Sequence, residues 1–172
     1  ARRGRTYFKC ENFDNAETLY KKLILKYPEK LNFEIKYIVC LSNNKKHDEA
    51  LQRLYKLNYE YPNDKNVIRL LGWNTLYTKQ LDKSSHYYSI LVSTHSDSIQ
   101  DYLYAGYCSW FQGNIEEAKE RFIHVFDNDS AKTTSMDEVL RSFFTNDSEL
   151  LINYGISNSE VEIMSDLVRG VS

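Results

Sequence analysis

The sequence predicts an all-α protein built from stacked helical hairpins. Apolar residues recur at helical spacing, small residues return every 34 positions, and the 172 residues include only six Gly and two Pro. The clearest hairpin covers residues 104–126, YAGYCSWFQGNIEEAKERFIHVF. Gly113 and Asn114 separate its two helices, and Asn114 with Glu117 has the spacing of a capping box.

The same unit occurs four times without insertions. We expect its second helices to begin near Asn15, His47, Lys83 and Ile115. Each second helix carries a small residue where it crosses its partner, and these residues are 34 apart: Ala16, Ala50, Ser84 and Ala118. A bulky side chain at such a crossing, or at Gly106 on the first helix, would push the helices apart.

Capping signals support the order of the elements. The first helix of the first unit is expected at Arg2–Cys10, with Asp14 and Glu17 capping the second helix. Ser98 with Asp101 is a further capping pair. Pro28 and Pro62 each end a second helix, because proline cannot continue one.

A fixed 34-residue period with Leu71-Gly72, Ala118 and Pro62 at these offsets resembles the tetratricopeptide repeat. The resemblance covers residues 1–130 and implies a right-handed superhelix, or solenoid, of four 34-residue helix-turn-helix repeats. The repeats span about residues 1–30, 31–64, 65–98 and 99–130.

The repeat phase is lost after Asp127, so we expect residues 131–172 to form a helical C-terminal cap. A solenoid needs an atypical end to cover its last apolar face. Ser135 with Glu138 and Ser159 with Glu162 are expected to cap helices there, and Gly155 to end a short segment. The segment is too apolar for a free tail, which predicts that residues 136–170 dock on repeat four; its apolar residues include Phe143, Phe144, Leu151, Val161, Met164 and Leu167.

Composition and motifs argue against several classes of function. A formal net charge of −2 disfavours general nucleic-acid binding, and no apolar run is long enough to span a membrane. No catalytic motif is present, so neither an enzyme nor a cofactor or metal is expected. The four His are interpreted as surface or boundary residues, and three Cys on first helices as buried free thiols: Cys10, Cys40 and Cys108.

The N-terminus shows no apolar signal segment, which favours a cytoplasmic location. It also lacks a starting Met, so the chain being part of a longer protein stays open as an alternative.

The resemblance implies a concave groove lined by the first helices, which changes from basic to aromatic along the array. The residues carried over to it are Arg5, Lys9, Lys36, Val39, Asn43, Arg69, Trp73, Tyr77, Leu103, Tyr107, Trp110 and Phe111. Some family members hold a chaperone's C-terminal carboxylates with Lys, Asn and Arg. The corresponding residues here do not fit that clamp: Ala1, Arg5, Lys36, Asn66 and Leu70.

These observations predict a non-catalytic protein-interaction module that binds a peptide or protein segment in the groove. Two alternatives stay open. The C-terminal segment folds over the groove aromatics, or the repeats are an assembly segment of a longer or self-associating array with no free groove. An RNA-binding repeat of the pentatricopeptide kind is disfavoured by the 34-residue phase and the acidic charge.

Overall fold

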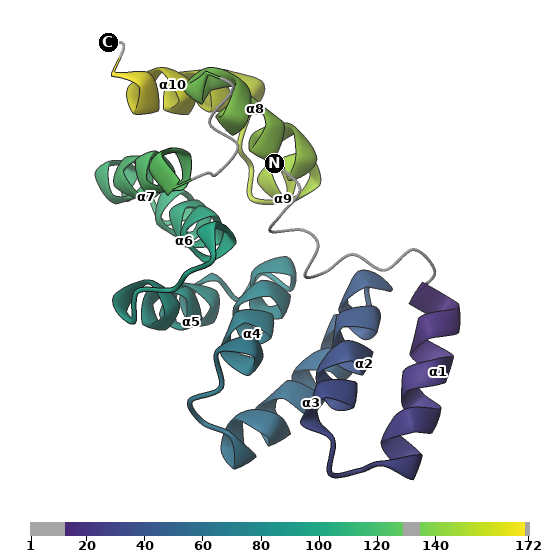
Figure 1. Ribbon diagram of the computed structural model, residues 1–172. Coiled ribbons are helices and arrows are strands. Elements are labelled where there is room, and N and C mark those ends of the chain that lie inside the picture. Colours follow the sequence, from purple (N-terminus) through teal and green to yellow (C-terminus); the bar gives the residue numbers. More distant parts are fainter. Residues whose placement is uncertain (1–12, 129–134, 171–172) are drawn as a thin grey trace. The chain divides into compact units, whose positions relative to one another are not determined.

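The structure is a computed structural model that describes residues 13–128 and 135–170, and these residues form ten α-helices and no strand (Figure 1). The all-α prediction is therefore confirmed for this part of the chain. The predicted helix Arg2–Cys10, with Arg5, Lys9 and Cys10, lies outside the described residues.

The helices pair as the 34-residue period predicts. The second helices begin at Phe13, His47, Leu81 and Ile115, within two residues of the predicted starts. The complete order is α1 Phe13–Lys26, α2 Leu31–Asn43, α3 His47–Glu60, α4 Lys65–Tyr77, α5 Leu81–Ser93, α6 Ile99–Phe111, α7 Ile115–Asn128, α8 Met136–Asn146, α9 Ser148–Asn153 and α10 Asn158–Arg169.

One turn geometry joins the helices of three hairpins. Lys45, Lys79 and Gly113 stand 34 residues apart, and each has a positive φ of 61°, 61° and 84°, respectively. After each of them, a backbone N–H reaches back five residues: Lys46 N to Leu41 O at 2.9 Å, Gln80 N to Thr75 O at 2.8 Å and Asn114 N to Ser109 O at 2.8 Å. Such a left-handed residue with this closing bond is the Schellman ending of a helix. The period in sequence is thus also a period in backbone conformation.

The described chain divides into two compact parts, an N-terminal part of residues 13–87 and a C-terminal part of residues 88–128 and 135–170, with the division inside α5. In the N-terminal part, α2 packs on α1, α3 and α4 (Figure 1). Its core is apolar and tightly closed, since Ile38, Leu54 and Leu70 have no exposed surface.

The small residues lie at the helix crossings of both parts. Ala50 and Ala118 have no exposed surface, as expected for residues between crossing helices. Ser84 is equally buried, and its hydroxyl donates to Gly72 O at 2.8 Å. A serine is tolerated at this crossing because its hydroxyl has an acceptor there.

The C-terminal segment is helical and docked on α7, as predicted. Helix α8 packs on α7, and α10 packs on both α7 and α8. The Phe144 ring meets the Phe122 ring edge-on with centroids 5.3 Å apart. Gly155 has a φ of 78° and follows α9, which agrees with its predicted place at the end of a short segment. The last apolar face of α7 is thereby covered.

Several predicted capping pairs are wrong. The predicted side chain either binds a different partner or already lies inside the helix. The cap of α10 is Ser157 with Glu160, which form the full capping box, two residues before the predicted pair. Both pairs have the same S-x-x-E spacing, and Glu162 instead binds Arg141. Asp14 is already inside α1, and Asp101 accepts from Ser96.

Two other helix starts have side-chain caps. Ser135 accepts from Glu138 N at 3.3 Å, so that predicted cap is present. Asp64 was not predicted and caps α4, where its carboxylate accepts from Asn66 N at 2.9 Å and Val67 N at 3.1 Å. A carboxylate at this end of a helix also complements the helix dipole.

Cys40 and Cys108 are buried free thiols, as predicted for these two positions. Across residues 13–128 and 135–170, no helix is both long and apolar enough to cross a membrane. No cluster of His, Cys, Asp or Glu in that same portion of the chain has the arrangement of a metal site.

Candidate peptide-binding face

The first helices of repeats two and three, α2 and α4, lie side by side in the N-terminal part. We call the side chains predicted there the first-helix face: Lys36, Val39, Asn43, Arg69, Trp73 and Tyr77. The two groove residues predicted in repeat one, Arg5 and Lys9, lie outside the described part of the chain.

The α2 side of this face is polar at its edges and apolar at its centre. Val39 is 9% exposed, and Asn43 closes the helix end by donating to Val39 O at 2.8 Å. Lys36 is exposed and lies towards α1, with its ammonium nitrogen 5.9 Å from the Tyr20 ring centroid. It therefore supplies positive charge at the border with α1.

The α4 side is aromatic. Trp73 is 8% exposed and Tyr77 is half-buried, with ring centroids 4.9 Å apart. Arg69 stands one turn before Trp73, and its guanidinium donates to Asn66 Oδ1 at 3.0 Å. Rigid aromatic side chains that keep some exposed surface can bury a large area on contact at low entropic cost.

The imidazole of His47, the first residue of α3, completes the aromatic group. It stacks on Tyr77 with centroids 5.7 Å apart and planes 17° from parallel, and its edge meets Trp73 at 5.9 Å. The sequence alone predicts no role for His47 beyond that of a surface or boundary residue. The signal that would have found it is its place directly after a turn, where one repeat meets the first helix of the next.

The predicted groove residues of repeat four are covered by the chain itself. Leu103, Tyr107 and Trp110 are buried within the C-terminal part, and the Trp110 ring meets Phe144 of α8 with centroids 5.5 Å apart. Tyr107 donates to the buried Asp147 carboxylate at 2.8 Å. The Phe111 ring stacks on Tyr154 with centroids 4.3 Å apart and planes 8° from parallel.

These contacts match the alternative in which the C-terminal segment folds over the groove aromatics. Burial, followed by the nearby Cys108, raises the pKa of Tyr154 to about 12, in keeping with a closed environment for this ring. Leu103, Tyr107 and Trp110 therefore belong to a packed core, and the half-buried Phe111 ring is covered on one face by Tyr154. The reason is that the cap helices supply Phe144, Asp147 and Tyr154 as partners.

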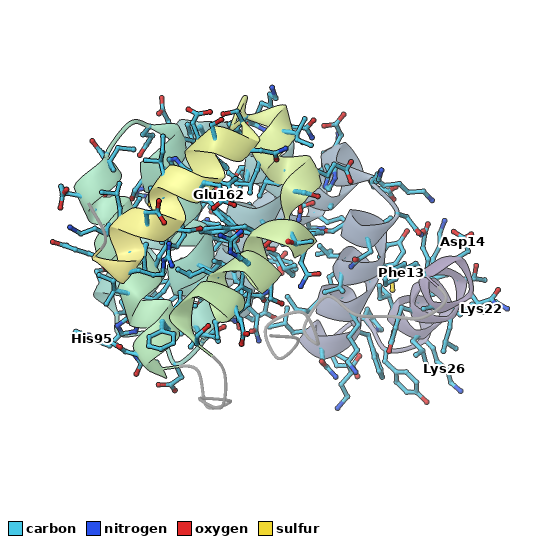
Figure 2. The ribbon with its side chains drawn as sticks, turned by 90° about the horizontal axis from the view of Figure 1, so that it is seen from above. Phe13, Asp14, Lys22, Lys26, His95 and Glu162 are labelled. Atoms are coloured by element: carbon cyan, nitrogen blue, oxygen red, sulfur yellow. The ribbon has the colours of Figure 1, made fainter. Side chains whose placement is uncertain are left out.

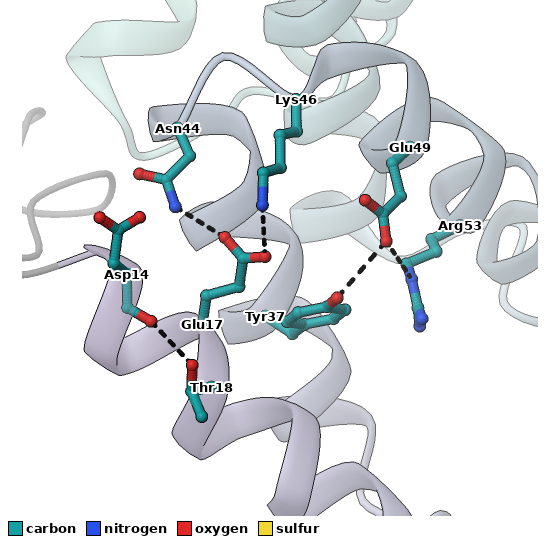
Figure 3. Close-up of polar contacts among 8 residues, drawn as sticks. All are labelled: Asp14, Glu17, Thr18, Tyr37, Asn44, Lys46, Glu49 and Arg53. Atoms are coloured by element: carbon teal, nitrogen blue, oxygen red, sulfur yellow. Dashed lines mark hydrogen bonds and ion pairs between the residues drawn. The ribbon is translucent and has the colours of Figure 1, made fainter.

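A hollow of about 610 Å³ lies elsewhere in the N-terminal part, between α1, α2 and α3. None of the predicted groove residues that the structure describes lines it, and three of its charged residues are paired within the chain. Arg53 donates to Glu34 at 2.8 Å. Arg53 also approaches Glu49, which accepts from Tyr37 (Figure 3). These pairs join α2 to α3, so charged side chains line the boundary between the two helices.

The outer side of α1 is basic, and Lys22 and Lys26 extend from it into solvent (Figure 2). Among the positions of the carboxylate clamp that the structure describes, Leu70 is fully buried and Asn66 accepts from Arg69.

The comparisons with known proteins agree with the hairpin geometry. The family model described as tetratricopeptide repeat matches residues 2–30, which end just after α1. No curated protein matches the chain. The match covers the first repeat, and three hairpins in the same 34-residue phase follow it, which supports a tetratricopeptide-repeat array and, more generally, a protein-interaction module.

Proposed function

We propose that the protein is a non-catalytic interaction module that binds a peptide or protein segment on the first-helix face of repeats two and three. The observation that carries this proposal is the aromatic group formed by His47, Trp73 and Tyr77. Its rings fix one another, so little side-chain entropy is lost when a partner covers them. The predicted aromatic residues of repeat four are less accessible, because Tyr107 and Trp110 are buried and the Phe111 ring is stacked on Tyr154.

The partner segment is expected to place an apolar or aromatic side chain on Tyr77. Lys36 adds a positive charge at the α1 border and Arg69 adds one beside Trp73, which favours a segment that also carries acidic groups. Charges at such a rim mainly set specificity and association rate, whereas the aromatic contact supplies most of the affinity.

A selection from a display library of random twelve-residue peptides tests the proposal. Peptides selected on the wild-type protein are measured again with Tyr77→Ala, which should weaken their binding about tenfold or more. Tyr59→Ala is the matched control, because Tyr59 is 90% exposed on α3 in the same part of the chain. Peptides that bind Tyr77→Ala as tightly as wild type would place the site elsewhere, and a selection without binders would refute the proposal.

Self-association is the second candidate function, and exposed apolar residues on the outer helices favour it. Leu25 and Leu19 on α1 are 80% and 53% exposed, and apolar surface of this kind gains free energy when a second copy covers it. Light scattering after size exclusion should show a concentration-dependent dimer if this candidate is right. Leu25→Glu should then restore the monomer, whereas a monomer at all concentrations would exclude self-association.

A further inference from the structure

The orientation of one buried amide fixes the chemistry of the His47 ring. Asn74 on α4 has no exposed surface, and its Nδ2 donates to Leu70 O at 2.9 Å. An amide nitrogen only donates and an amide oxygen only accepts, so the Leu70 contact decides which way the Asn74 amide points. Its Oδ1 must therefore be the atom that faces His47.

This arrangement determines where the neutral imidazole carries its proton. The contact between His47 Nδ1 and Asn74 Oδ1 is 2.8 Å. Because Oδ1 can only accept, Nδ1 must donate and so bears the hydrogen. The other ring nitrogen, Nε2, is then left with a lone pair and can only accept.

The ring is held in this position from three sides. Tyr77 stacks on one face, the Trp73 edge contact limits rotation, and the Asn74 bond fixes the Nδ1 side. Within the described part of the chain, this bond to Asn74 is the hydrogen bond of the His47 ring. The ring is half-buried, so it keeps exposed surface beside Tyr77.

We infer that His47 Nε2 is the hydrogen-bond acceptor of the first-helix face, and that the bound segment presents an N–H or O–H donor to it. This inference rests on the proposed function and sharpens its specificity. The donor must stand next to the apolar side chain that covers Tyr77, because both groups share one stack. With the imidazole neutral, a segment that places a carboxylate there gains no hydrogen bond, since its oxygen and Nε2 are both acceptors.

The first test needs no partner. Nitrogen-15 NMR of the protein, labelled at histidine, separates protonated from unprotonated ring nitrogens, and the loss of signals in His47→Phe assigns this residue. The expected spectrum at neutral imidazole shows hydrogen on Nδ1 and none on Nε2. Hydrogen on Nε2 would overturn the inference while leaving the proposed function in place.

The second test uses the twelve-residue peptides that bind wild type but not Tyr77→Ala. His47→Phe keeps an aromatic ring and removes the acceptor, and it should weaken these peptides about tenfold. His47→Gln offers an amide oxygen near the Nε2 position and should recover part of the affinity, whereas His47→Asn, which reaches only the Nδ1 position, should not. His86→Phe on α5 is the control, because His86 is an exposed histidine of the same part of the chain.

The outcomes separate the two claims. Peptides that depend on Tyr77 but bind His47→Phe with unchanged affinity would refute the role of His47 and keep the proposed function. Peptides that ignore Tyr77 would refute the proposed function itself. Losses in His47→Gln and His47→Asn with unchanged affinity in His47→Phe would show that His47 acts only by stacking.

Discussion

The ring of Phe122 occupies the space beside Gly106 where any other residue would place its Cβ. A Cβ built on Gly106 would lie 2.5 Å and 2.9 Å from two carbons of that ring. Both residues belong to the α6–α7 hairpin, and Phe122 has no exposed surface, so its ring has little room to move. The missing side chain at Gly106 is therefore what lets α6 and α7 approach each other.

Gly106→Ala should destabilise the C-terminal part by about 1–3 kcal/mol, because overpacking outweighs the better helix propensity of alanine. Urea unfolding followed by circular dichroism measures the free energy of unfolding. Adding Phe122→Leu should make Gly106→Ala less costly than it is in the wild-type background, because the smaller side chain frees space. A stability equal to or above wild type in Gly106→Ala alone would show that the ring can move aside.

The two lysines in left-handed backbone predict stabilising substitutions. Lys45 and Lys79 have φ of 61°, a conformation that costs a side-chain-bearing residue about 1–2 kcal/mol. Glycine removes that strain but loses about 0.4–1 kcal/mol through the entropy of the unfolded chain. Lys79→Gly should therefore raise the free energy of unfolding by up to about 1 kcal/mol.

Gly113→Ala is the matched control at the same position of the next repeat, where φ is 84°. Gly113→Ala should lower the free energy of unfolding, measured in the same experiment in which Lys79→Gly raises it. Opposite signs in the two variants would identify backbone conformation as the cause. Lower stability in both would mean that the Lys79 side chain makes contacts worth more than the strain.

Most of the fold could be predicted from the 34-residue period, because that period reflects steric limits at the helix crossings. Ala50, Ser84 and Ala118 are all fully buried, as their 34-residue spacing required. Caps were harder to predict, since a carboxylate can serve a helix end or a neighbouring element equally well. Glu17 has the spacing of a cap partner, yet it accepts from Asn44 and Lys46 across the space between α1 and the next turn (Figure 3).

The candidate site was only partly predictable for a related reason. Tyr77 and Phe111 stand 34 residues apart in equivalent places of the resemblance, and both are half-buried, but the Phe111 ring is covered on one face by Tyr154. Tyr154 follows α9, in the segment that comes after repeat four and lies outside the period. His47 was missed because its partners Trp73 and Tyr77 belong to the next repeat, and a periodic pattern describes each repeat by itself.

The bridge of Glu17 to the turn between α2 and α3 predicts a pH-dependent contribution to stability. Both carboxylate oxygens are engaged, by Lys46 Nζ at 2.7 Å and Asn44 Nδ2 at 2.7 Å. Burial works to raise the Glu17 pKa, but the bonds from Lys46 and Asn44 together lower it below its ordinary value. Such a carboxyl stabilises the fold fully above its unfolded pKa and loses this effect as the pH falls through its folded pKa.

Glu17→Gln should therefore lower the free energy of unfolding at pH 7 by about 1 kcal/mol or less, since Lys46 is well exposed and solvent screens the pair. The difference from wild type should stay constant between about pH 6 and 8 and shrink below about pH 4. Thermal melts at several pH values measure it, with Glu29→Gln as the control for an exposed carboxylate on the same side of the chain. A difference that grows in acid would contradict the assigned pKa direction.

The bond between Tyr107 and Asp147 predicts how firmly the C-terminal helices are held. Tyr107 has no exposed surface and Asp147 is 2% exposed, so the loss of this donor leaves a buried carboxylate less well solvated. Tyr107→Phe removes only the hydroxyl and should cost about 1–3 kcal/mol, which is the usual penalty for weakening a buried polar contact.

Hydrogen exchange should then speed up in α8 and α9 before it does in α2 and α3, because Asp147 lies at the junction of α8 and α9. Asp147→Asn added to Tyr107→Phe should cost less than the two single changes together, since a neutral amide needs less compensation than a carboxylate. Uniform acceleration over all helices would show that the bond supports global stability and does not hold the cap in particular.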